Sequence, residues 1–504
     1  MAKFSMVFGA ESVDVELPAE TVCLSMSEPG PLGDPSRVIR EALARPIGSP
    51  GLVELVRRKC EGRPGATAAV VISDNTRPVP YRGEAGILAP IVDTLIEAGI
   101  EPDRITVIAA TGTHRVLSRD ELERMIDPSV LARGVRIVCH DCRDRASLAS
   151  LGTTSRGTHV LINKAYLESD IKILTGLVES HFMAGTSGGR KSVCPGLIGE
   201  ESTYVFHGPE FLSSPNARDL VLEGNPCHEE SLEVAKMAGV DFIVNVTLNS
   251  KFELTGVYAG DLEEAHIAAT KRLAEYVSIP VDREYDIVVT HAGFVGINHY
   301  QAAKAAVVAI PVLRPGGRLI MGANNVDADP VGSPTYRTVL HLLTLHGPEA
   351  YMHLITSPDW RFVPDQWQVQ MWAKVFAKIP MENFTYCAPH ITPRDAAILP
   401  GRDGNLLLPP ERRYSRSLAD LARMVELAVG EAMEELRAKS DRPKGEGAHP
   451  TRPTIAYLKD GPYGIPVRRT WADSAGIQAH GRLSLAGDEP QVGSLPGLRA
   501  DPGL

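Results

Sequence analysis

The chain has 504 residues, 43% of them hydrophobic, so it can bury a large core and is long enough for roughly two to four domains. Its formal net charge is -10 at pH 7, which argues against a nucleic-acid partner and leaves anion binding to local lysines and arginines. The seven cysteines are odd in number and scattered, which does not indicate a disulfide framework. We find no signal-peptide core and no apolar segment long enough to span a bilayer, so the sequence predicts a cytoplasmic protein without a membrane partner.

The first part of the chain predicts strands and helices in alternation. Two short strands are expected at 4–8 and 13–17, as a small β edge to the main domain. From residue 66 onward apolar runs alternate with helical patterns, which is typical of a mostly parallel sheet. Helices are expected at 87–98 and from the capping box that begins at Ser118. Further strands are expected at 66–72, 105–110, 135–138, 160–163, 171–175 and 242–246.

A second alternation follows a proposed boundary at 279–282. It has a strand at 285–290, a helix at 301–309 and a strand at 318–321. The sequence therefore predicts an α/β protein with two α/β domains, 1–280 and 281–439, mostly parallel sheets, and an active-site cleft between them. A helix is expected at 418–439. The segment 440–504 is rich in Gly, Pro and Arg and is interpreted as a loosely packed extension.

Polar motifs follow three of the expected strands. Residues 74–78 read Asp-Asn-Thr-Arg-Pro, residues 111–115 read Thr-Gly-Thr-His-Arg, and residues 300–304 read Tyr-Gln-Ala-Ala-Lys. In open α/β sheets ligands bind outside the carboxyl ends of the strands, so these motifs favour one shared site. Gln301 and Lys304 would share a face of the helix expected there.

The stretch from 179 to 196 carries a histidine, a Gly-Gly turn and a lysine. Gly188 and Gly189 would let backbone N–H groups approach a phosphate closely. Pro195 prevents a regular helix, so Lys191 is expected on an ordered loop. By itself a Gly-Gly-Arg-Lys sequence fits a basic surface turn equally well.

Two other motifs were weighed for metal or cofactor chemistry. Cys139 and Cys142 form a CxxC, but no partner motif has zinc-ribbon spacing, so we interpret it as a turn at a strand end. No G-x-G-x-x-G follows a strand, which argues against an ordinary NAD-dependent dehydrogenase.

The motifs between Ser73 and Trp367, taken jointly and in this order, resemble the nickel-dependent lactate racemase family. Its members use a nickel-pincer nucleotide of the pyridinium-3,5-dithiocarboxylate mononucleotide type. The resemblance is carried by 74–78, 111–115, His181 with 187–191, His207, and 300–304.

The resemblance implies roles for individual residues. His114 and His181 would be the two catalytic bases, one for each enantiomer, and His207 would be the nickel ligand. Lys191 would hold the cofactor, by a covalent link or without one. Substrate contacts are implied for Arg77, Tyr300, Gln301, Lys304 and Trp367, with a core position for Trp367 equally open. Cofactor contacts are implied for Asp74, Thr111, Gly112, Thr113, Gly188, Gly189 and Arg190; Asp74 would orient Arg77 or a cofactor group.

The implied reaction is racemisation or epimerisation at C2 of a 2-hydroxy acid. It would proceed by reversible hydride transfer through a 2-keto acid, because the C2 proton is too weakly acidic for a side-chain base. Cofactor-synthesis proteins are the implied partners for loading. The polar neighbour His299 suggests an acid longer than lactate, and the choice among lactate, malate, an aromatic lactate and an aldonate stays open, as does the oligomeric state.

Two alternatives from other classes remain. The first is a zinc hydrolase in which His114, His181 and His207 converge on one metal ion. The second is a non-catalytic binder of the nickel nucleotide, which would need the phosphate and lysine features but neither the bases nor the carboxylate clamp.

Overall fold

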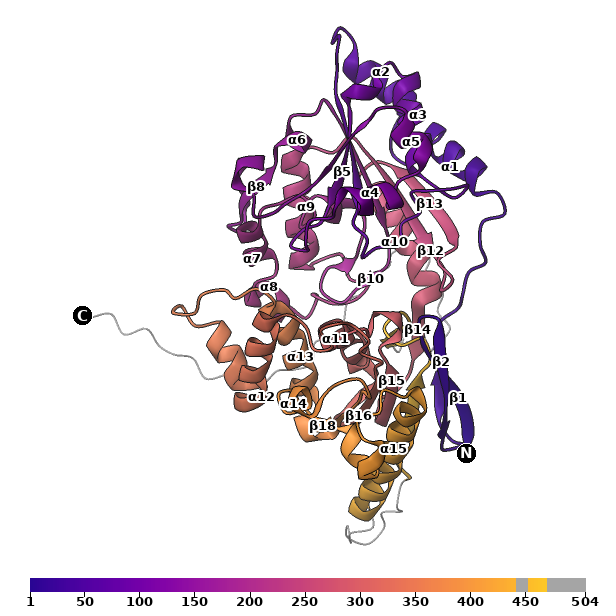
Figure 1. Cartoon of the computed structure of the whole chain (residues 1–504), viewed down its shortest axis with the longest axis vertical. Helices are drawn as coiled ribbons and strands as arrows, with labels where there is room; N and C mark the ends of the chain where they lie inside the picture. The colour runs from indigo at the N-terminus through magenta and orange to yellow at the C-terminus, as the bar shows by residue number, and fades with distance from the viewer. Residues whose placement is uncertain (441–451, 469–504) are drawn as a thin grey trace, which may run out of the picture. The chain divides into compact units, whose positions relative to one another are not determined.

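Two six-stranded sheets carry the fold, which confirms the predicted α/β class with mostly parallel sheets (Figure 1). The structure is a computed structural model and describes residues 1–440 and 452–468. None of the helices in these two ranges is long and apolar enough to cross a membrane.

The first sheet has the order β13-β12-β9-β4-β5-β6, and only β13 runs antiparallel to its neighbour. Its strands are nearly continuous apolar runs, as expected for strands covered on both faces. One face is covered by α1, α2 and α3, the other by α9 and α10. The bounds are β4 (Ala68–Ser73), β5 (Ile105–Ala110), β6 (Arg136–Cys139), β9 (Ile171–Leu177), β12 (Phe242–Leu248), β13 (Leu254–Gly260), α1 (Pro35–Ala44), α2 (Leu52–Cys60), α3 (Leu88–Glu97), α9 (Pro226–Ala238) and α10 (Glu264–Val277).

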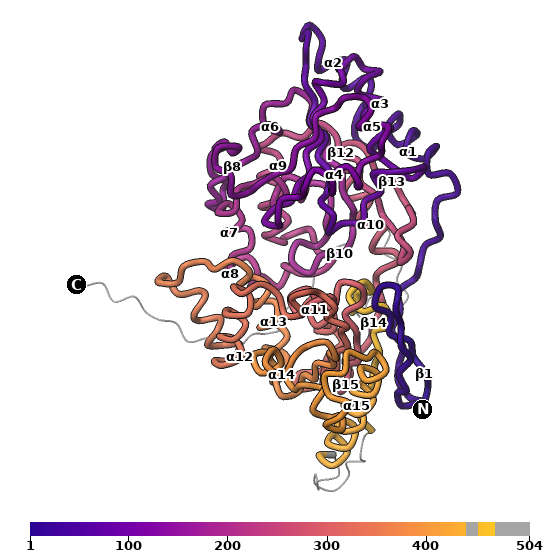
Figure 2. The backbone as a smooth tube through the Cα atoms, in the orientation of Figure 1, coloured from indigo at the N-terminus to yellow at the C-terminus, as the bar shows by residue number. Residues whose placement is uncertain are grey.

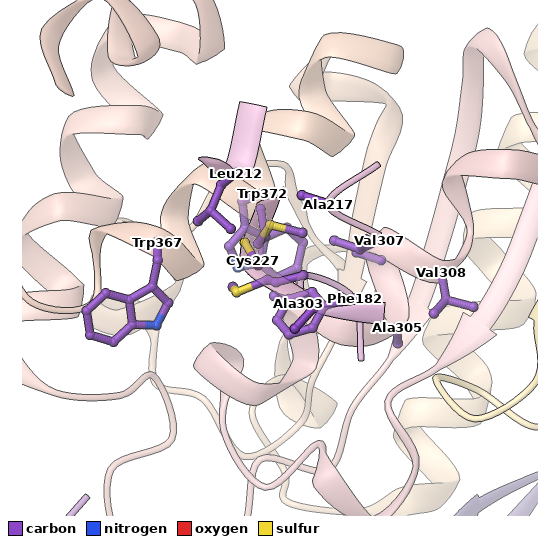
Figure 3. Packing of buried hydrophobic residues seen from close by; sticks show 14 of the residues in the cluster. Phe182, Leu212, Ala217, Cys227, Ala303, Ala305, Val307, Val308, Trp367 and Trp372 are labelled. Atoms are coloured by element: carbon purple, nitrogen blue, oxygen red, sulfur yellow. The ribbon is translucent and has the colours of Figure 1, made fainter. Parts of the chain in front are cut away.

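The second sheet has the order β18-β17-β16-β15-β19-β3 and is parallel throughout. One face packs against α11, α12 and α13, the other against α15. Figure 3 draws members of the larger core from α8, α9, α11 and α13. The bounds are β3 (Val22–Leu24), β15 (Tyr285–His291), β16 (Leu313–Gly322), β17 (Phe384–Cys387), β18 (Arg402–Asp403), β19 (Ile455–Leu458), α11 (His299–Val308), α12 (Pro334–Ile355), α13 (Gln366–Lys378) and α15 (Leu418–Ser440).

Smaller elements complete the fold. Strands β7 (Leu148–Thr153) and β8 (His159–Asn163) form an antiparallel pair, so the strand expected at 160–163 exists but lies outside the parallel sheet. The capping box at Ser118 opens α4, as predicted. The remaining short elements are α4 (Arg119–Met125), α5 (Pro128–Ala132), α6 (Lys164–Leu167), α7 (Thr203–Phe206), α8 (Pro209–Ser213), α14 (Pro393–Ala396), β10 (Ser180–His181), β11 (Gly185–Thr186), β14 (Ser278–Val281) and β20 (Ile465–Arg468).

The two ends of the chain differ from expectation. Strands β1 (Ala2–Phe8) and β2 (Glu11–Leu17) form a hairpin of their own that packs on α15, not an edge of the first sheet (Figures 1 and 2). Met6, Val15 and Leu17 are fully buried in this contact. The alternation of apolar and polar residues predicts the two strands, but it does not predict which surface their apolar side chains pack against.

The prediction of a loosely packed segment from residue 440 is wrong for 452–468. Strand β19 lies between β15 and β3 in the second sheet, and β20 pairs with β14. The run Ile-Ala-Tyr-Leu of β19 is buried and too short to show a period, which is typical of a parallel strand covered on both faces. The rest of 440–504 lies outside the described residues, apart from the end of α15.

Candidate functional site

His114 is oriented by a buried carboxylate. Its Nδ1 lies 2.7 Å from Asp74 Oδ2, and Asp74 also accepts hydrogen bonds from the backbone N–H (3.1 Å) and the hydroxyl (2.6 Å) of Thr76. Burial raises the pKa of Asp74, but the hydrogen bonds from His114 and Thr76 offset this, and the pKa lies below its usual value. A carboxylate only accepts, so a ring proton of His114 is assigned to Nδ1 and Nε2 is the nitrogen that faces away from Asp74.

The topology explains this pair. Strands β4 and β5 are neighbours and run parallel, with Ser73 opposite Ala110, so the loops that follow them meet at one edge of the sheet. Asp74 was expected to orient Arg77 or a cofactor group. Its side chain instead binds His114 and Thr76, and with 4% exposure it is covered by them.

His181 and Lys191 form the second polar pair. His181 Nδ1 accepts backbone N–H groups of Met183 (3.3 Å) and Ala184 (3.2 Å), which assigns the ring proton to Nε2. Nε2 lies 2.8 Å from Lys191 Nζ, so the amine must be uncharged to accept. Burial and the charge of Arg77 hold the pKa of Lys191 well below its usual value, in agreement with this arrangement.

Two tight turns hold this pair in place. His181 lies opposite Gly185 in the β10–β11 hairpin, where Gly185 has a φ of +78° that favours glycine. Lys191 lies in the short 3-10 turn Gly189–Ser192. The N–H of Gly112 donates to the carbonyl of Gly196 at 3.0 Å, which ties the loop of His114 to the loop that follows Lys191.

Positive charge gathers around His181. Burial lowers its pKa far below the usual value, and any positive charge on its neighbours Lys191, Arg77, Lys304 and His207 acts in the same direction. For Lys304, burial and Arg77 lower the pKa to about 8, while Glu179 and Asp219 raise it. Arg77 and Lys304, the residues predicted to contact the substrate carboxylate, thus both lower the pKa of His181.

His207 presents a buried nitrogen without a partner. Its Nδ1 is covered and makes no hydrogen bond within the described residues. Burial is the main cause that lowers the pKa of His207 to about 3, so the imidazole is neutral. Its ring stacks on Trp367 at 4.8 Å between centroids, and Trp367 Nε1 donates to Tyr300 Oη at 3.0 Å. Trp367 is therefore both buried and next to the predicted metal ligand.

The predicted helix at 301–309 is confirmed as α11. Asn298 caps it by accepting the N–H of Gln301 at 2.9 Å. Gln301 and Lys304 lie three residues apart and so share a face of α11. Thr113 is half-buried beside His114.

The structure speaks against direct phosphate contacts from the Gly-Gly-Arg turn. The N–H of Gly189 already donates to Asn245 Oδ1 at 3.2 Å, and a Cβ at Gly188 would lie 2.7 Å from Val178 Cγ2. Arg190 is 1% exposed. Its guanidinium bonds to His266 Nε2 at 2.8 Å and to the carbonyl of Ala184 at 2.7 Å. Gly188 and Gly189 pack closely against Val178 and His266, which leaves little room for a side chain at either position.

The Thr111 and Gly112 positions are used internally as well. The hydroxyl of Thr111 donates to the carbonyl of His140 at 2.7 Å, and the N–H of Gly112 is engaged by Gly196. Both hold the loop of His114, so their expected cofactor contacts are not available from these two donors.

We expect the Arg190→Met variant to be less stable than the unaltered protein, because it removes the buried hydrogen bonds of the Arg190 guanidinium. The change removes the donor to the buried carbonyl of Ala184 and one of the hydrogen-bond partners of His266 Nε2, at a cost of about 3 kcal/mol in the free energy of unfolding. Urea titration followed by circular dichroism measures this. Arg145→Met is the matched control, since Arg145 pairs with Glu201 at the surface and is 69% exposed. Its expected change is within about 0.5 kcal/mol, and equal losses in both variants would contradict a structural role for Arg190.

Known proteins match this chain over most of its length. The model of the lactate racemase N-terminal domain matches residues 8–219. The lactate racemase of Lactiplantibacillus plantarum is 33% identical over 340 residues, which cover 67% of this chain and 76% of that protein. The chain belongs to the lactate racemase family. A second lactate racemase, from Thermoanaerobacterium thermosaccharolyticum, is 28% identical over 417 residues, which cover 80% of this chain and 92% of that protein.

Solved structures agree on the fold of this lactate racemase family member. The lactate racemase apoprotein from Thermoanaerobacterium thermosaccharolyticum superposes with a TM-score of 0.75 at 24% identity, over 93% of this chain and all of that one. A Thermotoga maritima protein superposes with a TM-score of 0.59 at 17% identity, over 87% of this chain and 99% of that one. The protein is an enzyme of the isomerase class.

The three-histidine zinc site is not formed. Across 1–440 and 452–468, no three His, Cys, Asp or Glu side chains group in a way that could hold a metal ion. The CxxC is a turn at the end of β6, as predicted, and His140 within it bonds to the carbonyl of Ile198 at 3.1 Å.

His299 does not extend the substrate space. It is fully buried, lies 2.9 Å from Tyr336 Oη through its Nδ1, and stacks on Trp372 at 4.5 Å. The expectation of an acid longer than lactate assumed that His299 faces the substrate. That assumption is wrong, because His299 is buried in the core. Position 299 is the first residue of α11 and points into the core.

Sequence reasoning missed Glu179 as a site residue. Its carboxylate forms an ion pair with Arg77. The available signal was its place two residues before His181, in a segment already singled out for its polar residues.

Proposed function

We propose that the protein racemises a 2-hydroxy acid of the lactate type at C2, with a nickel-pincer nucleotide as cofactor. The observation that carries the proposal is a set of two histidines, His114 and His181, together with two cations that suit a carboxylate. His114 is held through its Nδ1 by the carboxylate of Asp74, and His181 lies in the field of Arg77 and Lys304.

The residues present fit such a cofactor. His207 offers one buried, unpaired nitrogen, which suits a metal that brings most of its ligands with it. Burial holds the pKa of Lys191 well below its usual value, which favours the uncharged amine that a covalent link requires. Lys191 would hold the organic part and His207 the nickel. When bound, the group supplies an electrophilic centre that accepts the C2 hydrogen with its electron pair and returns it.

His114 Nε2 would take the hydroxyl proton of one enantiomer. Asp74 fixes the required tautomer and stabilises the imidazolium that forms. The resulting 2-keto acid is planar, so it can be reduced on either face. His181 would take the hydroxyl proton of the other enantiomer. That role requires Nε2 to lose the ring proton that it donates to Lys191, so the tautomer of His181 would have to change once Lys191 holds the cofactor and no longer accepts.

Arg77 and Lys304 would bind the substrate carboxylate, with Gln301 adding a hydrogen bond. The guanidinium presents the planar fork that matches two carboxylate oxygens. Tyr300 and Trp367 would form the wall of the site beside His207.

The remaining parts of the proposal concern the setting of the enzyme. The chain would divide into two α/β domains near 279–282 with the site between them, act in the cytoplasm, and depend on cofactor-synthesis proteins for loading. A non-catalytic binder is the weaker candidate, because it would not need the His114–Asp74 pair.

The test is a panel of enantiopure 2-hydroxy acids labelled with deuterium at C2, comprising lactate, malate, phenyllactate and gluconate. Cofactor-loaded protein should invert at least one of them, with lactate favoured, and the product should keep its label because the histidines remove only the hydroxyl proton. Chiral chromatography with mass spectrometry reads both results. Extensive loss of label to water would indicate a carbanion route, and inversion of none of the acids would contradict the proposed function.

A further inference from the structure

One ion pair lies where the proposed function needs an open anion site. Glu179 pairs with Arg77, and the two side chains remain 33% and 29% exposed. Glu179 also raises the pKa of Lys304, so its charge acts on both cations assigned to the substrate carboxylate. The carboxylate of Glu179 therefore already forms with Arg77 the ion pair that a substrate carboxylate would form.

The backbone of Glu179 is fixed while its side chain is not enclosed. Its N–H donates to Ser187 Oγ at 3.0 Å, and its carbonyl accepts the N–H of Ser187 at 2.9 Å. These two bonds anchor the residue on the turn that leads to Lys191. The only hydrogen bond recorded for its carboxylate within the described residues is the one to Arg77. Rotation of this side chain would release Arg77 without moving the chain.

We propose that Glu179 is a resident counter-ion that occupies the carboxylate site of Arg77 and Lys304 in the empty protein and is displaced by the substrate. The inference rests on the proposed function for the identity of the substrate. Glu179 is then an affinity-setting residue. It competes with every incoming carboxylate, and it keeps the two cations compensated when no substrate is present. The alternative is that Glu179 permanently holds Arg77 in position. Removing its charge would then weaken anion binding, whereas removing a counter-ion that competes with the substrate would strengthen it.

The experiment measures anion binding to the full chain without cofactor. Acetate is the probe, because it has the carboxylate but neither the hydroxyl nor the C2 hydrogen that chemistry needs. Glu179→Gln keeps the shape and removes the charge, and it should bind acetate at least about fivefold more tightly than the unaltered protein. Calorimetric titration in low-salt buffer gives the dissociation constants, because salt would screen the effect.

Two variants sharpen the result. Glu229→Gln is the matched control, since Glu229 pairs with Arg156 at similar exposure, 38% and 34%, and its acetate affinity should not change. Adding Arg77→Met to Glu179→Gln should abolish the gain, because the gained affinity is for Arg77. Weaker or unchanged binding in Glu179→Gln, or no acetate binding in either protein, overturns the inference.

Failure of this inference and failure of the proposed function are distinguishable. A gain in acetate affinity without inversion of any acid in the labelled panel leaves the counter-ion role standing and removes the racemase proposal. Inversion of an acid with no gain in Glu179→Gln removes the counter-ion role alone.

Discussion

Replacing either His114 or His181 by alanine should abolish interconversion of the enantiomers in both directions, with kcat lowered at least about a hundredfold. The reason is that the two directions share one path. The hydroxyl proton of one enantiomer leaves to one histidine, and that of the other enantiomer leaves to the other. Loss of one histidine therefore blocks the path at one end, whichever enantiomer is supplied. Initial rates from each pure enantiomer, followed by chiral chromatography, measure this.

The Asp74→Asn variant tests whether Asp74 is needed to orient the ring of His114 and fix its tautomer, because it leaves His114 itself in place. The amide can offer an N–H to Nδ1 where the carboxylate accepts one, which favours the wrong tautomer with its proton on Nε2. We expect kcat to fall strongly while the cofactor content stays at its normal level. His353→Ala is the control, because His353 is exposed on α12 and should retain full activity. A variant of His114 or His181 that still converts one enantiomer at the normal rate would contradict the two-base path.

Several features of this site followed from the order of residues alone. Motifs placed directly after β4 and β5 had to meet, because neighbouring parallel strands end at one edge of the sheet. The sequence therefore predicts that the motifs of Asp74 and His114 share one site. The helix that carries Gln301 and Lys304 followed from its pattern, and the structure adds the Asn298 cap that begins it.

The partners of these side chains did not follow from the sequence. A carboxylate after a strand can reach any cation or ring nearby, so Arg77 was as reasonable a partner for Asp74 as His114 was. The bond between His181 and Lys191 depends on the β10–β11 hairpin, which has only two residues in each strand and no visible period. The glycine pair fits phosphate binding and close packing equally well in sequence, and the Asn245 and His266 contacts decide for packing.

The ends of the chain show a second limit of sequence patterns. Strands β3 and β19 are short, come from opposite ends of the sequence, and pair only with each other and β15. A strand of four buried residues has no alternation to detect, and its neighbours are set by tertiary packing. The Gly- and Pro-rich composition of the segment 440–504 therefore hid β19, an interior strand of the second sheet.

His207→Ala should remove most of the nickel from protein made in cells that synthesise the pincer cofactor, where the unaltered protein should hold about one nickel per chain. His207 is neutral, its Nδ1 is buried without a partner, and no other group of metal ligands exists within the described residues. The variant loses the one imidazole that the chain offers to the metal. The organic part of the cofactor should remain, because Lys191 is untouched.

The two contributions separate when nickel and nucleotide phosphate are measured on the same samples. His207→Ala should lower nickel and keep phosphate, whereas Lys191→Ala should lower both, because the anchor of the whole group is removed. His353→Ala again serves as the control and should retain nickel and phosphate. Full nickel retention in His207→Ala would remove His207 from the ligands, and the orphaned Nδ1 beside Trp367 would then need another partner.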